Sequence, residues 1–213
     1  MTFETWKPIG DEEQPIWEAT AAELGLFYKE GTASKPPIIT GTIDGFLVKV
    51  ECTAEREHHA PPKTMYRVTY PSLGDPIRIG RERTIRKVGI LRRLIHVHDI
   101  EIGDRAFDRL AIIDADDVEA AATFLTESRR EIIATVLRSR KMRNVIVSES
   151  STSFDTDKVE HRADRLAGNI LGLAQLAGLL ARSEAGTDPQ AVQLRSFFDD
   201  DHSDPSPIQD QDP

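Results

Sequence analysis

The sequence predicts an α+β fold, with antiparallel β-hairpins followed by a strand-turn-strand-helix-strand unit and a C-terminal apolar helix. Three patterns predict it: an Asp-Gly pair between two β-rich runs, a change from period-two to helical apolar spacing within residues 100–147, and a regular apolar stripe over residues 161–183. The chain has 213 residues, of which 39% are hydrophobic. That length predicts a single domain over residues 1–183, followed by a tail.

Residues 15–28 are expected to form an N-terminal helix, because Pro15 suits a first helical turn and Trp17 and Leu24 share one apolar face. A β-rich part is expected over residues 38–102. Its first hairpin joins residues 38–42 to 46–52 through Asp44 and Gly45, which both tolerate positive φ. Residues 64–70 and 77–80 are expected to form a second hairpin, and residues 91–102 a further strand.

An α/β part is expected over residues 103–183. Gly103 and Asp104 turn the chain into a short strand, and Asp114 is the N-cap candidate for the helix that follows. Thr126 is a candidate break between two helices. Residues 145–149 are expected to form the next strand, and residues 150–157 a loop or a distorted edge strand.

The net charge of −9 is distributed unevenly along the chain. One run is strongly basic, and its basic residues are Arg78, Arg81, Arg83, Arg86, Lys87, Arg92 and Arg93. Such a patch attracts the phosphates of nucleic acid or of anionic lipid. It lacks the interleaved aromatic residues of a base-stacking surface. A solvated hairpin or loop is therefore the favoured interpretation, and polyanion binding is the alternative.

Residues 184–213 are predicted to be a disordered acidic tail, because they are rich in aspartate and proline. Leu194, Phe197 and Phe198 stand beside an acidic run within it, which is typical of short segments that dock on a partner. A chance pair of phenylalanines is the alternative. If the tail covers the basic run, its removal should raise binding to a polyanion.

The residues that could carry chemistry form no complete constellation. His96 and His98 would share one face of a strand and could bind a divalent metal, but the third and fourth ligands are missing. A metal-assisted hydrolase is therefore the third alternative. Cys52 has no neighbouring histidine, and acid pairs such as Asp116 and Asp117 suit a helix start. We expect no catalytic residues and no cofactor.

An uncharged stretch, residues 166–181, contains Gly168 and Gly172 at the GxxxG spacing of packed membrane helices. It is shorter than the roughly 20 residues that cross a bilayer, so no span is expected. The favoured interpretation is a core helix or a homodimer seam. The residues of that seam are Leu166, Ile170, Leu173, Leu176 and Leu180.

Four stretches, GTIDGFLVKV, TMYRVTY, GDRAFDRLAIIDADD and VIVSES, together resemble bacterial domains of unknown function. In those domains a β-hairpin layer precedes a turn with the pattern Gly-Asp, two residues, Phe-Asp. The resemblance covers roughly residues 38–180. It implies an α+β fold with no catalytic residues, and some relatives of this layout are tethered to membranes.

The leading hypothesis is a non-catalytic interaction or regulatory domain that self-associates or binds a protein partner. An acidic N-terminus without a signal-peptide pattern and a single cysteine favour a cytoplasmic location. Polyanion binding and metal-assisted hydrolysis are the two alternatives to this hypothesis.

Overall fold

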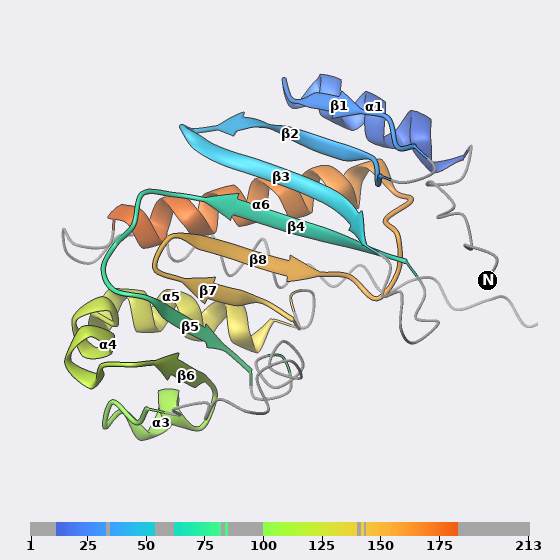
Figure 1. Cartoon of the computed structure of the whole chain (residues 1–213). Helices are drawn as coiled ribbons and strands as arrows, with labels where there is room; N and C mark the ends of the chain where they lie inside the picture. Colours follow the sequence, from blue (N-terminus) through green and yellow to red (C-terminus); the bar gives the residue numbers. More distant parts are fainter. Residues whose placement is uncertain are drawn as a thin grey trace, which may run out of the picture.

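The structure is a computed structural model, and it describes residues 12–32, 35–53, 62–81, 84, 100–139, 142 and 144–182. These residues form an α+β fold, as the sequence predicts (Figure 1). The strands are β1 (Phe27–Lys29), β2 (Ile38–Ile43), β3 (Phe46–Thr53), β4 (Lys63–Thr69), β5 (Ile77–Gly80), β6 (Ile112–Ala115), β7 (Ile146–Ser148) and β8 (Ser151–Asp155). The helices are α1 (Glu13–Glu23), α3 (Arg105–Asp108), α4 (Val118–Phe124), α5 (Glu127–Arg138) and α6 (Ala163–Arg182).

The eight strands form one sheet in the order β1-β2-β3-β4-β8-β7-β5-β6, and neighbouring strands are antiparallel. The predicted hairpin of β2 and β3 is confirmed. Ile43 pairs with Phe46 across a two-residue turn, in which Asp44 has a φ of 51° and Gly45 a φ of 84°. Positive φ at both positions matches the twist of a hairpin, which is why Asp-Gly is favoured there.

The second predicted hairpin is wrong. Both of its strands form, but β4 pairs with β8, and β5 pairs with β7 and β6. The β7–β8 hairpin lies between them. Strand β8 is therefore central in the sheet, where the sequence predicted a loop or an edge strand. Its side chains alternate, and Thr152 and Phe154 are buried on one side.

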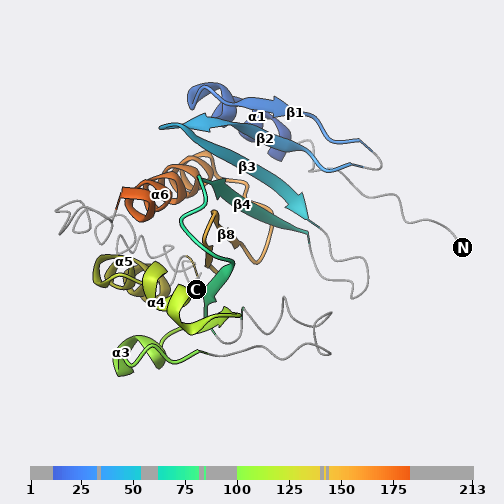
Figure 2. The same ribbon diagram turned by 60° about the vertical axis from the view of Figure 1, so that its left-hand side comes forward.

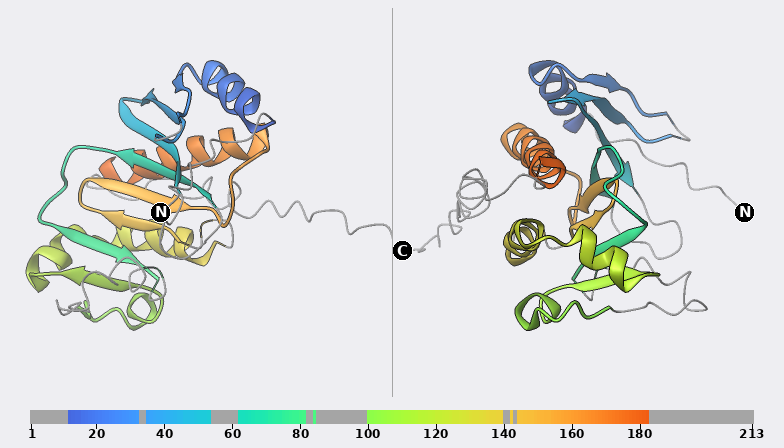
Figure 3. Two further views of the ribbon diagram at one scale, coloured as in Figure 1. Left: turned by 45° about the vertical axis from the view of Figure 1, so that its right-hand side comes forward. Right: turned by 90° about the vertical axis from the view of Figure 1, so that its left-hand side faces the viewer.

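The helices α1, α5 and α6 lie on one face of the sheet (Figure 3). Helix α6 packs across β3, β4 and β8, with α1 on one side of it and α5 on the other. Figure 2 shows the same layering from another direction. The hydrophobic core lies between this helical layer and the sheet, and it includes the stacked rings of Tyr66 and Phe154, whose centroids are 4.6 Å apart.

Helix α1 ends earlier than the sequence predicted. Gly25 has a φ of +67°, Leu26 donates its N–H to the carbonyl of Ala21, and Gly25 donates to Ala22. These two bonds form a Schellman motif, in which glycine ends a helix because it adopts the left-handed conformation without steric cost. Phe27 consequently lies in the edge strand β1 rather than in the helix.

The predicted helix of the α/β part is divided in two at Thr126, which caps α5 by accepting from the N–H of Arg129 at 3.4 Å. The predicted N-cap was wrong: Asp114 lies in β6, and Asp117 caps α4 by accepting from Glu119 at 2.8 Å. The N-cap moves because β6 continues as an extended strand through Ala115. Residues 91–99 lie outside the described part of the chain, and residues 100–102 form no assigned strand.

Helix α6 forms the centre of the helical layer. The five side chains proposed for a homodimer seam, namely Leu166, Ile170, Leu173, Leu176 and Leu180, are at most 1% exposed. They cover the sheet of their own chain, as a core helix does. Self-association stays a prediction, and it needs another surface. No helix in the described part of the chain is long and apolar enough to cross a membrane.

Candidate interaction surface

The face of the sheet opposite α1, α5 and α6 is the candidate interaction surface, here called the open face. It follows from the alternation of side chains along each strand. In β3, Val48, Val50 and Cys52 are buried under the helices, whereas Leu47 and Lys49 point to the other side. The same alternation assigns the open-face side chains of the other strands.

Strand pairing aligns the open-face side chains into rows that cross the sheet, because directly paired residues point to the same side. One row crosses five strands, and its members are Phe27, Thr40, Lys49, Arg67 and Ser153. The next row places Leu47 between Thr42 and Thr69. Side chains from residues 27 to 153 are thereby brought onto one surface.

Two large apolar side chains on the open face are accessible. Phe27 is 76% exposed and Leu47 is 50% exposed. They are separated by β2, whose residues Thr40 and Thr42 present small hydroxyl side chains between them. The open face therefore offers apolar contact area at two points, with the polar side chains of β2 between them.

Lys49 and Arg67 are directly opposite each other on β3 and β4. Like charges in that position are unfavourable unless they are neutralised. An ion pair reduces this repulsion, because Nζ of Lys49 lies 2.7 Å from Oε2 of Glu51, and the ammonium of Lys49 stays partly exposed. Arg67 is exposed and forms no ion pair with any residue that the structure describes.

The open face is basic, although the whole chain has a net charge of −9. Its basic residues outnumber its acidic ones. The basic residues are Lys29, Lys49, Lys63, Arg67 and Arg78, and the acidic residues are Glu51, Asp114 and Asp155. A ligand for this surface is therefore expected to carry negative charge.

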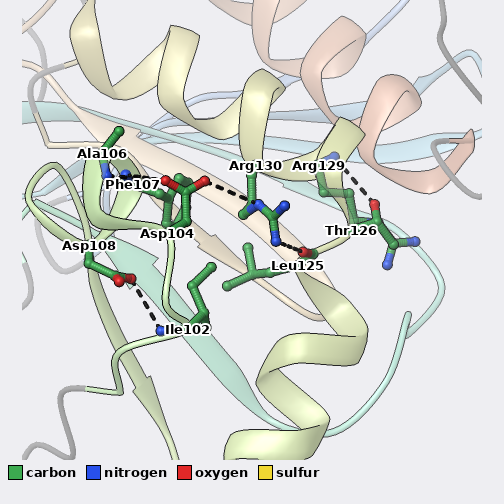
Figure 4. Close-up of polar contacts among 9 residues, drawn as sticks. All are labelled: Ile102, Asp104, Ala106, Phe107, Asp108, Leu125, Thr126, Arg129 and Arg130. Carbon is green, nitrogen blue, oxygen red and sulfur yellow. Dashed lines mark hydrogen bonds and ion pairs between the residues drawn. The ribbon is translucent and has the colours of Figure 1, made fainter.

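The turn that carries the family resemblance, Gly103 to Asp108, has a structural role (Figure 4). Gly103 has a φ of +84°, and Asp104 caps α3 by accepting from the N–H of Phe107 at 3.2 Å. The carboxylate of Asp108 accepts from the N–H of Ile102 at 3.2 Å. The ring of Phe107 is buried. Each residue of the motif thus helps to fix the turn.

The turn is attached to α5 by Arg130. Its Nε lies 3.5 Å from Oδ2 of Asp104, and its Nη1 donates to the carbonyl of Leu125 at 3.2 Å. Arg130 therefore joins the turn before α3 to the junction between α4 and α5 (Figure 4). The sequence separates these segments by about twenty residues, so only the fold shows the contact.

One other arginine, Arg81, binds the carboxyl end of a helix. Arg81 donates from Nε to the carbonyl of Leu137 at 2.7 Å and from Nη2 to that of Ser139 at 3.3 Å, at the end of α5. A guanidinium suits this position, because the last carbonyls of a helix lack intrahelical donors and carry partial negative charge. Arg81 was a candidate for polyanion binding, which stays a prediction, and the structure shows that it caps α5.

The remaining predicted site residues are distributed as follows. Arg78 is exposed on the open face, on β5. The rest of the basic run, Arg83, Arg86, Lys87, Arg92 and Arg93, lies outside the described residues. The same holds for His96 and His98, and for the tail residues Leu194, Phe197 and Phe198. The predictions made for all of these residues stay predictions.

The described residues contain no cluster of three or more histidine, cysteine or acidic side chains that could hold a metal ion. Cys52 is buried, and burial raises the pKa of its thiol to about 11, with a smaller increase from the carboxylate of Glu13. A thiol with such a pKa is almost entirely protonated at neutral pH and is a poor nucleophile.

The sequence predicted β2, β3 and β4 but not the surface that they help to form, and it placed β1 in a helix and β8 in a loop or an edge strand. Alternation in residues 46–53 and 63–69 shows that each strand has two faces, and this signal was readable. Which face meets the helices depends on where α6 packs, so Leu47, Lys49 and Arg67 could not be singled out. Phe27 was missed because it was assigned to the N-terminal helix.

Comparison with known proteins gives a distant match among solved structures. No family model matches the chain, and no curated protein matches it. Among solved structures, the chain is similar to the crystal structure of the mycobacterial trehalose monomycolate transport factor A, TtfA. The two share 13% sequence identity at a TM-score of 0.48, and the match covers 81% of this chain and 96% of the other.

Proposed function

We propose that this chain is a non-catalytic interaction domain whose open face binds an acidic polypeptide segment that carries large apolar side chains. One observation carries the proposal: exposed Phe27 and Leu47 lie on the same face as the cross-strand cations Lys49 and Arg67. Apolar contact supplies binding free energy, and the cations select a ligand by its charge.

The spacing of the open face suits an extended polypeptide. Residues i and i+2 of an extended chain point to the same side and are about 6.8 Å apart. Leu47 and Lys49 have this spacing along β3, and Arg67 lies beside Lys49 on β4. A segment with an apolar residue followed two positions later by an aspartate can therefore contact Leu47 and the cations together.

The proposal also covers the predicted self-association. Two open faces placed against each other would bring Lys49 and Arg67 of one copy against the same cations of the second copy, which is unfavourable. Self-association by this surface is therefore proposed to use an acidic segment of one chain and the open face of another.

The test is a titration of the full chain into a fluorescein-labelled nonapeptide that contains two adjacent phenylalanines followed by three aspartates. Saturable binding measured by fluorescence anisotropy is expected. Arg67→Gln and Leu47→Ser should each weaken the affinity about tenfold, because each removes one contact. A peptide with serines in place of the phenylalanines should bind the wild-type chain about as weakly as the original peptide binds the Leu47→Ser variant.

Matched controls lie away from the open face. Leu171 on α6 is 43% exposed and Arg105 on α3 is exposed, so Leu171→Ser and Arg105→Gln should leave the affinity unchanged. If the open-face and control variants bind the peptide equally well, the proposed surface is wrong. If heparin displaces the peptide, and if the serine peptide binds as tightly as the phenylalanine peptide, the polyanion alternative is favoured instead.

A further inference from the structure

We propose that the acidic segment which binds the open face is the chain's own C-terminal segment, residues 184–213, and that it occupies the face in cis. Phe198 would contact Leu47, and Asp200 would contact Lys49 and Arg67. This inference rests on the proposed function, and it adds that the domain controls access to its own binding surface.

Charge complementarity is the first argument for this occupant. The segment contains eight acidic residues against Arg195 alone, and three of the eight are consecutive, Asp199 to Asp201. The open face is basic, and exposed Arg67 lies near its centre without an ion pair to any described residue. The segment is also the most acidic stretch of the chain, so it is the internal segment that fits best by charge.

The spacing of the side chains is the second argument. Phe198 and Asp200 are two positions apart and point to the same side of an extended chain, about 6.8 Å from each other. Leu47 and Lys49 have the same spacing on β3, and Arg67 is directly opposite Lys49. One extended segment laid along β3 can thus pair an aromatic ring with Leu47 and a carboxylate with the two cations.

The third argument is the position of the end of α6, from which the segment continues. Helix α6 ends at Arg182, and a Cβ placed on Gly178 would lie 3.5 Å from Cε2 of Phe46, the residue before Leu47. The end of α6 therefore lies at the end of the sheet where β3 begins (Figure 1). Sixteen Cα–Cα steps separate Arg182 from Phe198, and a random coil of that length has a root-mean-square span of about 20 to 24 Å. That span exceeds the roughly 10 Å between packed layers, so the segment can pass around the end of the sheet.

Occupation in cis has a measurable consequence for other ligands. A tethered segment acts at an effective concentration that can reach the millimolar range, so it competes strongly with any free acidic peptide. In the titration described above, the combined change Phe198→Ser and Asp200→Asn should tighten binding of the labelled peptide about tenfold. The matched change Ile208→Ser and Asp210→Asn, at the same spacing further along the segment, should leave it unchanged.

The decisive experiment is zero-length crosslinking of the dilute full chain with a water-soluble carbodiimide, which condenses a carboxylate with an amine in contact. The expected product is an amide between the Nζ of Lys49 and an aspartate at 199–201, within one chain. Lys158 is exposed in the connection between β8 and α6 and is the internal control, for which no such product is expected. Arg67→Glu should lower the yield of the crosslink to Lys49 about fivefold, because it places a negative charge opposite the aspartates. Adding Asp199→Lys and Asp200→Lys to Arg67→Glu reverses both charges and should restore the contact between the segment and the open face. This contact is measured as protection of residues 195–201 from hydrogen exchange.

The outcomes separate this inference from the proposed function. Peptide binding that depends on Leu47 and Arg67, without an intramolecular crosslink to Lys49, would keep the proposed function and overturn occupation in cis. Crosslinks found only between chains, or equally frequent at Lys158, would also overturn it. If the peptide does not bind even after the change at Phe198 and Asp200, and no crosslink forms, both proposals fail.

Discussion

Trp17 donates its indole N–H to the carbonyl oxygen of Glu160 at 3.0 Å, across 143 positions of the sequence. The N–H of Glu160 in turn donates to the hydroxyl of Thr64 at 2.8 Å. Both bonds are buried, and this connection ties α1 and β4 to the segment that leads into α6.

We predict that Trp17→Phe lowers the free energy of unfolding by about 2 to 3 kcal/mol. The change leaves the buried carbonyl of Glu160 without its donor and removes part of a side chain that is fully buried. Urea denaturation followed by far-ultraviolet circular dichroism measures the effect. Leu171→Ala, at an exposed position of α6, is the control and should change stability by less than about 0.5 kcal/mol.

Arg129 should be sensitive even to a conservative replacement. Its buried guanidinium donates from Nε to the carbonyl of Leu180 at 3.1 Å and from Nη1 to that of Phe124 at 3.1 Å, so it joins the ends of α6 and α4. Lysine keeps the charge but cannot reproduce this fork. We expect Arg129→Lys to cost about 2 kcal/mol in chemical denaturation. Arg105→Lys, on the exposed surface of α3, should be close to neutral, and an equal loss in both variants would contradict the assigned role.

The two aspartates before α4 are predicted to differ. Asp117 accepts from the N–H of Glu119 at 2.8 Å, whereas Asp116 is exposed and makes no capping bond. Asp117→Ala should therefore lower stability by about 1 kcal/mol. Asp116→Ala should have an effect of a few tenths at most. Thermal unfolding of the two variants side by side measures this difference, and a larger effect of Asp116→Ala would show that the cap is misassigned.

Stability should fall at high pH in a way that depends on Cys52. Burial raises the pKa of this thiol to about 11, whereas in the unfolded chain it titrates near its ordinary value, about 8.5. Between these values the folded state keeps a proton that the unfolded state has released. The contribution of Cys52 is therefore complete below pH 8.5 and is lost as the pH rises toward 11.

The isosteric change Cys52→Val should remove this part of the pH dependence. We expect the wild type to lose about 2 to 3 kcal/mol more than Cys52→Val between pH 8.5 and pH 11, measured by urea denaturation at several pH values. Burial also raises the pKa of Tyr66 and Tyr70, so the variant should still lose some stability. Parallel curves for the two proteins would show that the thiol titrates normally.

The sequence by itself determined the local structure wherever a short-range rule operates. Asp44 and Gly45 predict their hairpin because the turn needs positive φ at two adjacent residues, and the hydroxyl of Thr126 predicts the helix break because it can replace one missing backbone acceptor. The apolar period of residues 163–182 predicts a helix, and it leaves open what the helix covers.

Only the tertiary structure decided strand order, and with it the candidate surface. Strand β8 enters between β4 and β7, where its buried Thr152 and Phe154 join the layer under α6, and no local pattern records this long-range pairing. Once α6 is placed there, Leu166 and its four partners belong to the core, and Leu47 and Arg67 are left facing outward. Side-chain alternation gives every strand two faces, and it is the packing of a distant helix that makes one of them a core and the other a surface.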